Sequence, residues 1–166
     1  MGLELTKVME ISTGHRLPLH NGGCSNFHGH NYGVKVRLLF YPDSHKKIQQ
    51  VGFVIDFKEI KQIINLYDHK FLMHSEDEYL ADMKDMPGLV IVDYSPSVEN
   101  IVKDYTNQIA KVIQDKLKQG NLVDDSGNYP NFKINLSISE TKTAICSKQT
   151  LFEYVPRQGL WLEKTY

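Results

Sequence analysis

Two segments of the chain place an apolar residue at every second position, and this alternation constrains the fold more than any other feature. The apolar positions of the two segments are Tyr32, Val34, Val36, Leu38 and Phe40, and then Phe132, Ile134, Leu136 and Ile138. Successive side chains of a β-strand project from opposite faces, so each segment predicts a strand with one face in the core. Residues 3–12 predict a further strand, which we expect to pair antiparallel with the one after His30.

Helical spacing of apolar residues marks two helices between these strands. Asp56 and Glu59 have the spacing of a capping box, and the residues behind them predict a helix that ends near 68–70. A second helix is predicted from Ser95-Pro96, with serine as the cap and proline at the first position, to Gly120.

The connections predict smaller additions to this plan. We expect a buried strand at 51–56, irregular structure at 73–85, an added strand at 89–92, a loop at 121–131, and a last strand at 143–154 with a polar interruption at 147–149. The order strand-strand-helix-helix-strand-strand indicates an α+β fold, an antiparallel sheet with helices on one face. With 166 residues, the chain is expected to form a single domain over 1–166.

Composition argues against several classes of function. The formal net charge is −1 and no basic block is present, so no nucleic-acid partner is expected. No apolar run approaches transmembrane length, so no membrane partner is expected either. Cys24 and Cys146 stand in no paired motif, which argues against a disulfide scaffold. We expect a soluble, cytoplasmic protein.

The motif His28-Gly29-His30 opens the first alternating strand and is the strongest chemical signal. Residues two apart share a strand face, so both imidazoles would point the same way. His15, which follows the strand expected to pair with this one, is the natural third ligand, whereas His20 lies in the loop between and is expected to be exposed. Three imidazoles favour zinc over calcium or magnesium.

Cys24 leaves the nature of this metal site open. As a fourth ligand it would close a structural zinc site, since such sites have four protein ligands. Outside the coordination sphere it would be a thiol beside a cation, with a lowered pKa, available as a base.

Two further motifs have residues suited to proton transfer or ligand binding, but neither motif predicts such a role when taken alone. Asp68-His69 would form a carboxylate-oriented proton shuttle, but adjacent helical residues do not face one another, so spacing alone favours an exposed pair at a helix end. In Glu140-Thr141, after the strand at 132–138, the carboxylate could accept two N–H bonds from the guanidine-like edge of a pterin or guanine. Taken alone, a solvated strand-end charge explains Glu140 better. Glu99 is explained by its place in the first turn of a helix.

Taken together and in order, these motifs resemble the 6-pyruvoyl-tetrahydropterin synthase superfamily. The set comprises His15, Cys24-x-x-x-His28-Gly29-His30, Asp68-His69, Pro96-Ser97-x-Glu99-Asn100 and Glu140-Thr141, and it spans residues 5–150. The cysteine spacing, Gly52-Phe53-Val54-Ile55-Asp56-Phe57 and Glu140-Thr141-Lys142-Thr143-Ala144 are most like the 6-carboxytetrahydropterin synthases of queuosine biosynthesis. The insert at 73–93 is longer than that branch requires.

The resemblance implies the tunnelling fold and a zinc ion held by His15, His28 and His30. It implies 7,8-dihydroneopterin triphosphate as substrate and 6-carboxytetrahydropterin, acetaldehyde and triphosphate as products. Members are hexamers, two stacked trimers, so a homo-oligomer is expected.

The resemblance also implies roles for the other site residues. Cys24, as thiolate, would accept a proton, and His69, supported by Asp68, would relay protons from a neighbouring subunit. Glu140, with Thr141, would anchor the pterin ring, and Glu140 is also a candidate catalytic member of the proton relay. Arg16, Lys142 and Arg157 are candidates for holding the triphosphate.

Two alternatives remain at this point. The pyruvoyl branch eliminates triphosphate from the same substrate and begins with the same proton abstraction. A binding protein without turnover, stabilised by zinc with Cys24 as the fourth ligand, belongs to a different class.

Overall fold

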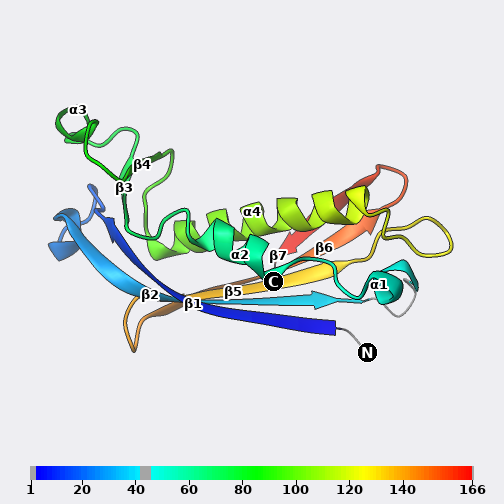
Figure 1. Cartoon of the computed structure of the whole chain (residues 1–166). Coiled ribbons are helices and arrows are strands. Elements are labelled where there is room, and N and C mark those ends of the chain that lie inside the picture. The colour runs from blue at the N-terminus through cyan, green and yellow to red at the C-terminus, as the bar shows by residue number, and fades with distance from the viewer. Residues whose placement is uncertain (1–2, 42–45, 166) are drawn as a thin grey trace.

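The computed structural model, which describes residues 3–41 and 46–165, is built on one curved sheet of seven strands (Figure 1). Across the sheet the strand order is β4-β3-β1-β2-β5-β6-β7. The strands are β1 (Leu3–His15), β2 (His28–Phe40), β3 (Lys70–His74), β4 (Leu89–Val92), β5 (Phe132–Ser139), β6 (Ile145–Val155) and β7 (Leu160–Thr165).

Strand directions divide the sheet into two parts. The pairs β1–β2, β2–β5, β5–β6 and β6–β7 are antiparallel, and β1 meets β2 along its whole length, from Leu3 opposite Phe40 to His15 opposite His28. By contrast, β3 runs parallel to β1, and β4 runs parallel to β3. The expected α+β class is confirmed, but the expectation of a purely antiparallel sheet is wrong at this edge. The reason is that α1 and α2 lead the chain from the end of β2 back to the end of β1, where β3 then runs in the direction of β1.

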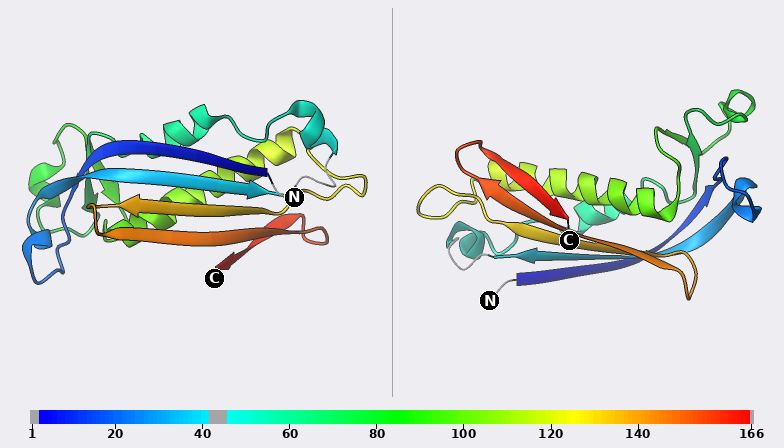
Figure 2. Two further views of the ribbon diagram at one scale, coloured as in Figure 1. Left: turned by 90° about the horizontal axis from the view of Figure 1, so that it is seen from below. Right: turned by 180° about the vertical axis from the view of Figure 1, so that it is seen from behind.

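Helices cover one face of the sheet, as predicted. The helices are α1 (Lys46–Val51), α2 (Phe57–Ile64), α3 (Leu80–Met83) and α4 (Val98–Gln119), with a 3₁₀ turn at Gly23–Ser25. Both views of Figure 2 place α2 and α4 along the same side of the strands. The alternating apolar residues of β2 and β5 are all buried and pack in one core with the buried faces of α2 and α4. No helix in the described ranges is long and apolar enough to cross a membrane.

The predicted strand at 51–56 is wrong. Its first residue, Val51, ends α1, and Gly52 has a φ of +82°, which takes the backbone out of the extended conformation. Val54 and Ile55 still bury their side chains, so the apolar run reflects core contact without strand pairing. The capping box of Asp56 and Glu59 is confirmed at the start of α2.

The start of α4 also differs from the prediction. Ser97, and not Ser95, is the N-cap, and its side-chain oxygen accepts a hydrogen bond from the N–H of Asn100. Pro96 therefore lies outside the helix, with its carbonyl directed to a side chain of β1. The predicted helix end at Gly120 is confirmed.

Three further expectations need correction. The segment 73–85, predicted to be irregular, contains the end of β3 and all of α3. The polar residues 147–149 do not interrupt β6, because they pair with β5 like their neighbours. Strand β7 was not expected, whereas the added strand at 89–92 is confirmed as β4.

Candidate active site

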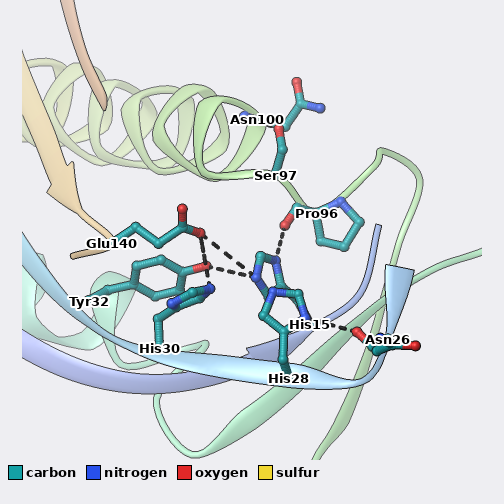
Figure 3. A network of polar contacts seen from close by, with 9 residues as sticks. All are labelled: His15, Asn26, His28, His30, Tyr32, Pro96, Ser97, Asn100 and Glu140. Atoms are coloured by element: carbon teal, nitrogen blue, oxygen red, sulfur yellow. Dashed lines mark hydrogen bonds and ion pairs between the residues drawn. The ribbon is translucent and has the colours of Figure 1, made fainter. Parts of the chain in front are cut away.

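Three histidines meet where β1 ends and β2 begins (Figure 3). His15 is paired with His28, and Thr13 with His30, so the antiparallel register puts all three imidazoles on the helix-covered face. The ring centroids lie 4.5 Å apart for His15 and His28, and 5.1 Å apart for His28 and His30. One ligand nitrogen from each of the three lies within 4.8 Å of the others. Strand register therefore brings His15 beside two histidines that lie 13 and 15 positions further along the chain.

Hydrogen bonds to backbone carbonyls fix two of these rings. His15 Nδ1 lies 2.6 Å from the carbonyl oxygen of Pro96, and His28 Nδ1 lies 2.8 Å from that of Asn26. A carbonyl oxygen only accepts, so each Nδ1 carries the hydrogen and each Nε2 of the neutral ring carries a lone pair. The same arrangement orients metal-ligating histidines in general.

The environment of the Nε2 atoms points to a metal ion. Those of His28 and His30 are buried without a hydrogen-bond partner among the described residues. Burial lowers the pKa of His15, and the nearby His28 and His30 lower it further, against the opposing effect of the Pro96 carbonyl. The neutral imidazole, which is the form that binds metals, is thus favoured. These three side chains fit a metal ion.

Glu140 and Tyr32 border the cluster. Glu140 follows β5, as predicted, and its Oε1 lies 3.3 Å from His30 Nε2 and 3.9 Å from His15 Nε2. The Tyr32 hydroxyl donates to the same oxygen at 3.4 Å. Burial and the Glu140 charge raise the pKa of Tyr32, which keeps the phenol protonated as a donor. Sequence reasoning treated Tyr32 only as core, although its place two residues after His30 on the same strand face was a usable signal.

Cys24 lies in the 3₁₀ turn that precedes β2. Its carbonyl accepts a hydrogen bond from the N–H of Leu17 at 2.8 Å, and the residue is partly exposed. Within the described part of the chain, the group of mutually close ligand atoms contains the three histidines and does not include the Cys24 thiol. This geometry gives no support to Cys24 as a fourth ligand and leaves it as a thiol in the turn that leads into β2.

Asp68 and His69 are brought into contact by a turn after α2. Because α2 ends at Ile64 and His69 has a φ of +56°, the two neighbours face each other, with His69 Nδ1 2.9 Å from Asp68 Oδ1. Ser12 holds the pair from both sides, since its N–H donates to Asp68 Oδ1 and its carbonyl accepts from the N–H of His69. The His69 side chain is 81% exposed.

The Asp68–His69 pair does not reach the histidine cluster within one chain. His69 lines an open groove of about 510 Å³ that is also lined by Ser12, Gly14, Gly29 and Asn31, and by His30 of the cluster. Ser12, Gly14, Gly29 and Asn31 alternate along their strands with the residues that carry the cluster side chains, so these four positions belong to the other face of the sheet.

A comparison with family models identifies the family of the chain. The model for 6-pyruvoyl tetrahydropterin synthase matches residues 4–149. The chain belongs to this family. The resemblance drawn from the ordered motifs is thereby confirmed.

Relatives within the pterin synthase family are similar over part of their length. A probable 6-carboxy-5,6,7,8-tetrahydropterin synthase of Halobacterium salinarum is 30% identical over 96 residues, which cover 56% of this chain and 60% of that protein. A 6-carboxy-5,6,7,8-tetrahydropterin synthase of Rickettsia felis is 27% identical over 115 residues, which cover 64% of this chain and 80% of that one. The match thus spans less than two thirds of the Halobacterium protein.

Solved structures support the fold. The 6-pyruvoyl tetrahydropterin synthase of Plasmodium falciparum superposes with a TM-score of 0.61 at 19% identity, covering 93% of this chain and 99% of that one. The Plasmodium vivax enzyme gives a TM-score of 0.60 at 19% identity, with the same coverage of each chain.

The three candidates for holding a triphosphate differ in burial. Lys142 and Arg157 are exposed. Arg16 is 3% exposed, and its guanidinium donates at 2.7 Å to the buried carboxylate of Asp77. Arg16 is therefore the wrong candidate, because its charge is already paired inside the protein.

Proposed function

We propose that this member of the pterin synthase family is a zinc-dependent lyase. It would convert 7,8-dihydroneopterin triphosphate to 6-carboxy-5,6,7,8-tetrahydropterin, with release of acetaldehyde and triphosphate. The observation that carries the proposal is the convergence of three histidines beside the Glu140 carboxylate, with the buried Nε2 atoms of His28 and His30 lacking hydrogen-bond partners among the described residues. The names of the relatives support the carboxy reaction, which would belong to queuosine biosynthesis in the cytoplasm.

His15, His28 and His30 would hold the zinc ion. Three neutral imidazoles leave a fourth position open, which is the ligand set of a catalytic zinc site. When bound, zinc supplies Lewis-acid chemistry that acidifies the side-chain hydroxyls of the substrate and their neighbouring C–H bonds.

The chain supplies the groups that bind substrate and move protons. Glu140 would accept two N–H bonds from the pterin ring, and Tyr32 would hold that carboxylate in place. The Thr141 hydroxyl accepts a hydrogen bond from the N–H of Ala144, which closes the turn that carries Glu140 and presents the 140–141 segment to the ring. Cys24 would take a proton from the substrate side chain, since a thiol near a cation is readily deprotonated.

Asp68 and His69 would serve the active site of a neighbouring subunit. The Asp68 carboxylate accepts the His69 Nδ1 hydrogen, which leaves Nε2 free to exchange a proton, and the ring is exposed to reach another chain. Strand β1 pairs with β3 only over Thr13–His15, so its outer edge over Leu3–Ile11 has no strand partner in the described ranges. A free edge of this length favours association with a further chain. A hexamer of two trimers agrees with both features.

Product analysis tests the proposed reaction. Purified, zinc-loaded protein is incubated with 7,8-dihydroneopterin triphosphate, and the pterin products and trapped acetaldehyde are measured by mass spectrometry. We expect 6-carboxytetrahydropterin and acetaldehyde in equal amounts. A pyruvoyl product without acetaldehyde would assign the chain to the other branch, and tight zinc binding without conversion would support a non-catalytic zinc protein.

A further inference from the structure

A buried ion pair lies beside the active site and is used by none of the steps above. Arg16 is 3% exposed and Asp77 is 6% exposed, and Arg16 Nη1 donates to Asp77 Oδ1 at 2.7 Å. The two residues are 61 positions apart, since Arg16 follows β1 and Asp77 lies in the insert between β3 and β4. A buried pair of this kind is costly to desolvate and is therefore a weak explanation for stability alone.

Besides Asp77, the Arg16 guanidinium contacts a backbone carbonyl, a second carboxylate and two aromatic rings. Its Nε donates to the carbonyl of Ser25 at 2.9 Å, and its Nη2 donates to Glu78 at 3.2 Å. The ring of Tyr79 lies 4.6 Å from the guanidinium carbon, and that of Phe27 lies 5.5 Å from it. We call this set, Arg16 with Ser25, Phe27 and residues 77–79, the Arg16 clamp.

The clamp joins the insert to the two segments that carry reactive residues. Arg16 directly follows the metal-binding candidate His15, and Ser25 directly follows Cys24. The turn between them is closed by the hydrogen bond from the Leu17 N–H to the Cys24 carbonyl. The hydrogen bond from the guanidinium to the Ser25 carbonyl thus acts on the residue next to Cys24, while the contacts with residues 77–79 hold the guanidinium to the insert.

We propose that Arg16 is a positioning residue that ties the insert, through Asp77, to the Cys24 turn and so sets the place of the Cys24 thiol relative to the three histidines. The insert at 73–93 is then part of the active-site scaffold and not a peripheral addition. A displacement of about 1 Å in a reacting group lowers turnover by up to about 100-fold, so such a tie has a measurable effect.

The planar shape of arginine is essential to this role. The guanidinium donates from a rigid fork and lies against aromatic rings, whereas a lysine ammonium is a compact charge without that geometry. Arg16→Lys keeps the charge beside Asp77 but loses the simultaneous contacts to Ser25 and the two rings. It therefore separates the positioning role from simple charge compensation.

The test combines turnover with a measurement that needs none. In Arg16→Lys we expect kcat to fall by about 10- to 100-fold, with KM and zinc content close to those of the unmodified protein. The rate of Cys24 alkylation by iodoacetamide, measured by peptide mass spectrometry against Cys146 in the same molecule, should change by at least about threefold. Asp77→Asn should act in the same direction with a smaller effect.

Two variants control for stability. Arg37→Lys alters a comparable arginine–carboxylate pair, with Glu4, that is exposed and lies far along the strand from the site, and it should change neither readout. The double variant Arg16→Met with Asp77→Leu removes both charges and should recover thermal stability without recovering kcat. Full recovery of kcat in the double variant would overturn the proposal. So would an Arg16→Lys variant that lowers only the melting temperature.

The inference rests on the proposed function, but its failure is distinguishable from that of the function. If the unmodified protein converts no pterin triphosphate, the proposed function fails, and the Cys24 alkylation rates still decide whether the clamp positions the thiol. If conversion is normal and Arg16→Lys leaves both kcat and alkylation unchanged, only the clamp proposal fails.

Discussion

The histidine cluster and the Asp68–His69 pair are built in opposite ways. His15 is 1% exposed, and its ring is fixed by the Pro96 carbonyl at 2.6 Å. His69 has its backbone fixed by Ser12 and its Nδ1 held by Asp68, yet its side chain is 81% exposed. One imidazole is enclosed by its own chain, whereas the other is oriented by its own chain and presented outward.

This difference indicates which part of the site one chain completes. The cluster has all its supporting hydrogen bonds within the chain, so a single copy preorganises the metal ligands. The Asp68–His69 pair is equally well oriented, but His69 lines an open groove, which His30 of the cluster also lines. The role proposed for His69 therefore requires a second copy that brings its own reactive groups to this groove.

The largest loss of zinc and of turnover is expected when a ligand of the histidine cluster is removed. His28→Ala removes one of three ligands, so we expect zinc content to fall to near zero and turnover to fall by about 1000-fold or more. Metal content by inductively coupled plasma mass spectrometry and product formation check this. His20→Ala, which changes an exposed histidine of the nearby loop, is the matched control and should keep both. Unchanged zinc content in His28→Ala would refute the ligand assignment.

A smaller loss, confined to chemistry, is expected at Cys24. Cys24→Ala should retain zinc and thermal stability while turnover falls by about 100-fold or more, because the proton acceptor is lost. Cys146→Ala, on β6, removes the other thiol, whose pKa is raised by burial, and should leave turnover unchanged. Loss of zinc together with loss of stability in Cys24→Ala would instead make this cysteine a structural ligand.

Sequence reasoning was most reliable where one physical rule decides the outcome. Strand periodicity fixes the side-chain face, so His28 and His30 could be placed together, and pairing of two successive strands brought in His15. Glu140 was predicted at a strand end for the same reason. Local capping rules placed the start of α2 and the end of α4.

Predictions failed where long-range contacts override local pattern. The apolar run at 51–56 buries Val54 and Ile55 in the core. Periodicity cannot distinguish such a buried irregular segment from a buried strand. Pro96 was assigned to a helix start, whereas its carbonyl is used by His15, 81 residues away. The burial of Arg16 depends on Asp77 in a segment with no recognisable pattern, so Arg16 was mistaken for an anion-binding residue.

The proposal that His69 serves the active site of a neighbouring subunit is tested by mixing two inactive variants. If Cys24 and His69 of one site come from different subunits, Cys24→Ala and His69→Ala subunits refolded together restore some intact sites. Random assortment at equal amounts gives roughly a quarter of the unmodified turnover. Each variant refolded alone is the control and should stay inactive. A mixture no more active than its components would place both residues in the same chain's site.

The smallest effect is expected at the residue that anchors the Asp68–His69 turn to α4. Tyr67 directly precedes Asp68; its hydroxyl donates to Asp104 at 2.6 Å, and its carbonyl accepts from the Thr13 hydroxyl at 2.8 Å. Tyr67→Phe removes the hydrogen bond to Asp104 and the one shared with the Tyr94 hydroxyl at 3.1 Å, so it should lower the free energy of unfolding by about 1 to 2 kcal/mol near neutral pH.

The pH dependence of unfolding distinguishes this anchor from a general loss of packing. Burial, with the Asp104 hydrogen bond, raises the pKa of Tyr67 from 10.0 to about 12. The unfolded chain therefore loses this proton before the folded one does, so the stabilisation is complete below pH 10.0 and is lost as the pH rises toward 12. Denaturant unfolding of Tyr67→Phe should show a shallower decline across this interval than the unmodified protein. An identical decline would mean that Tyr67 titrates normally and does not tie the His69 turn to α4.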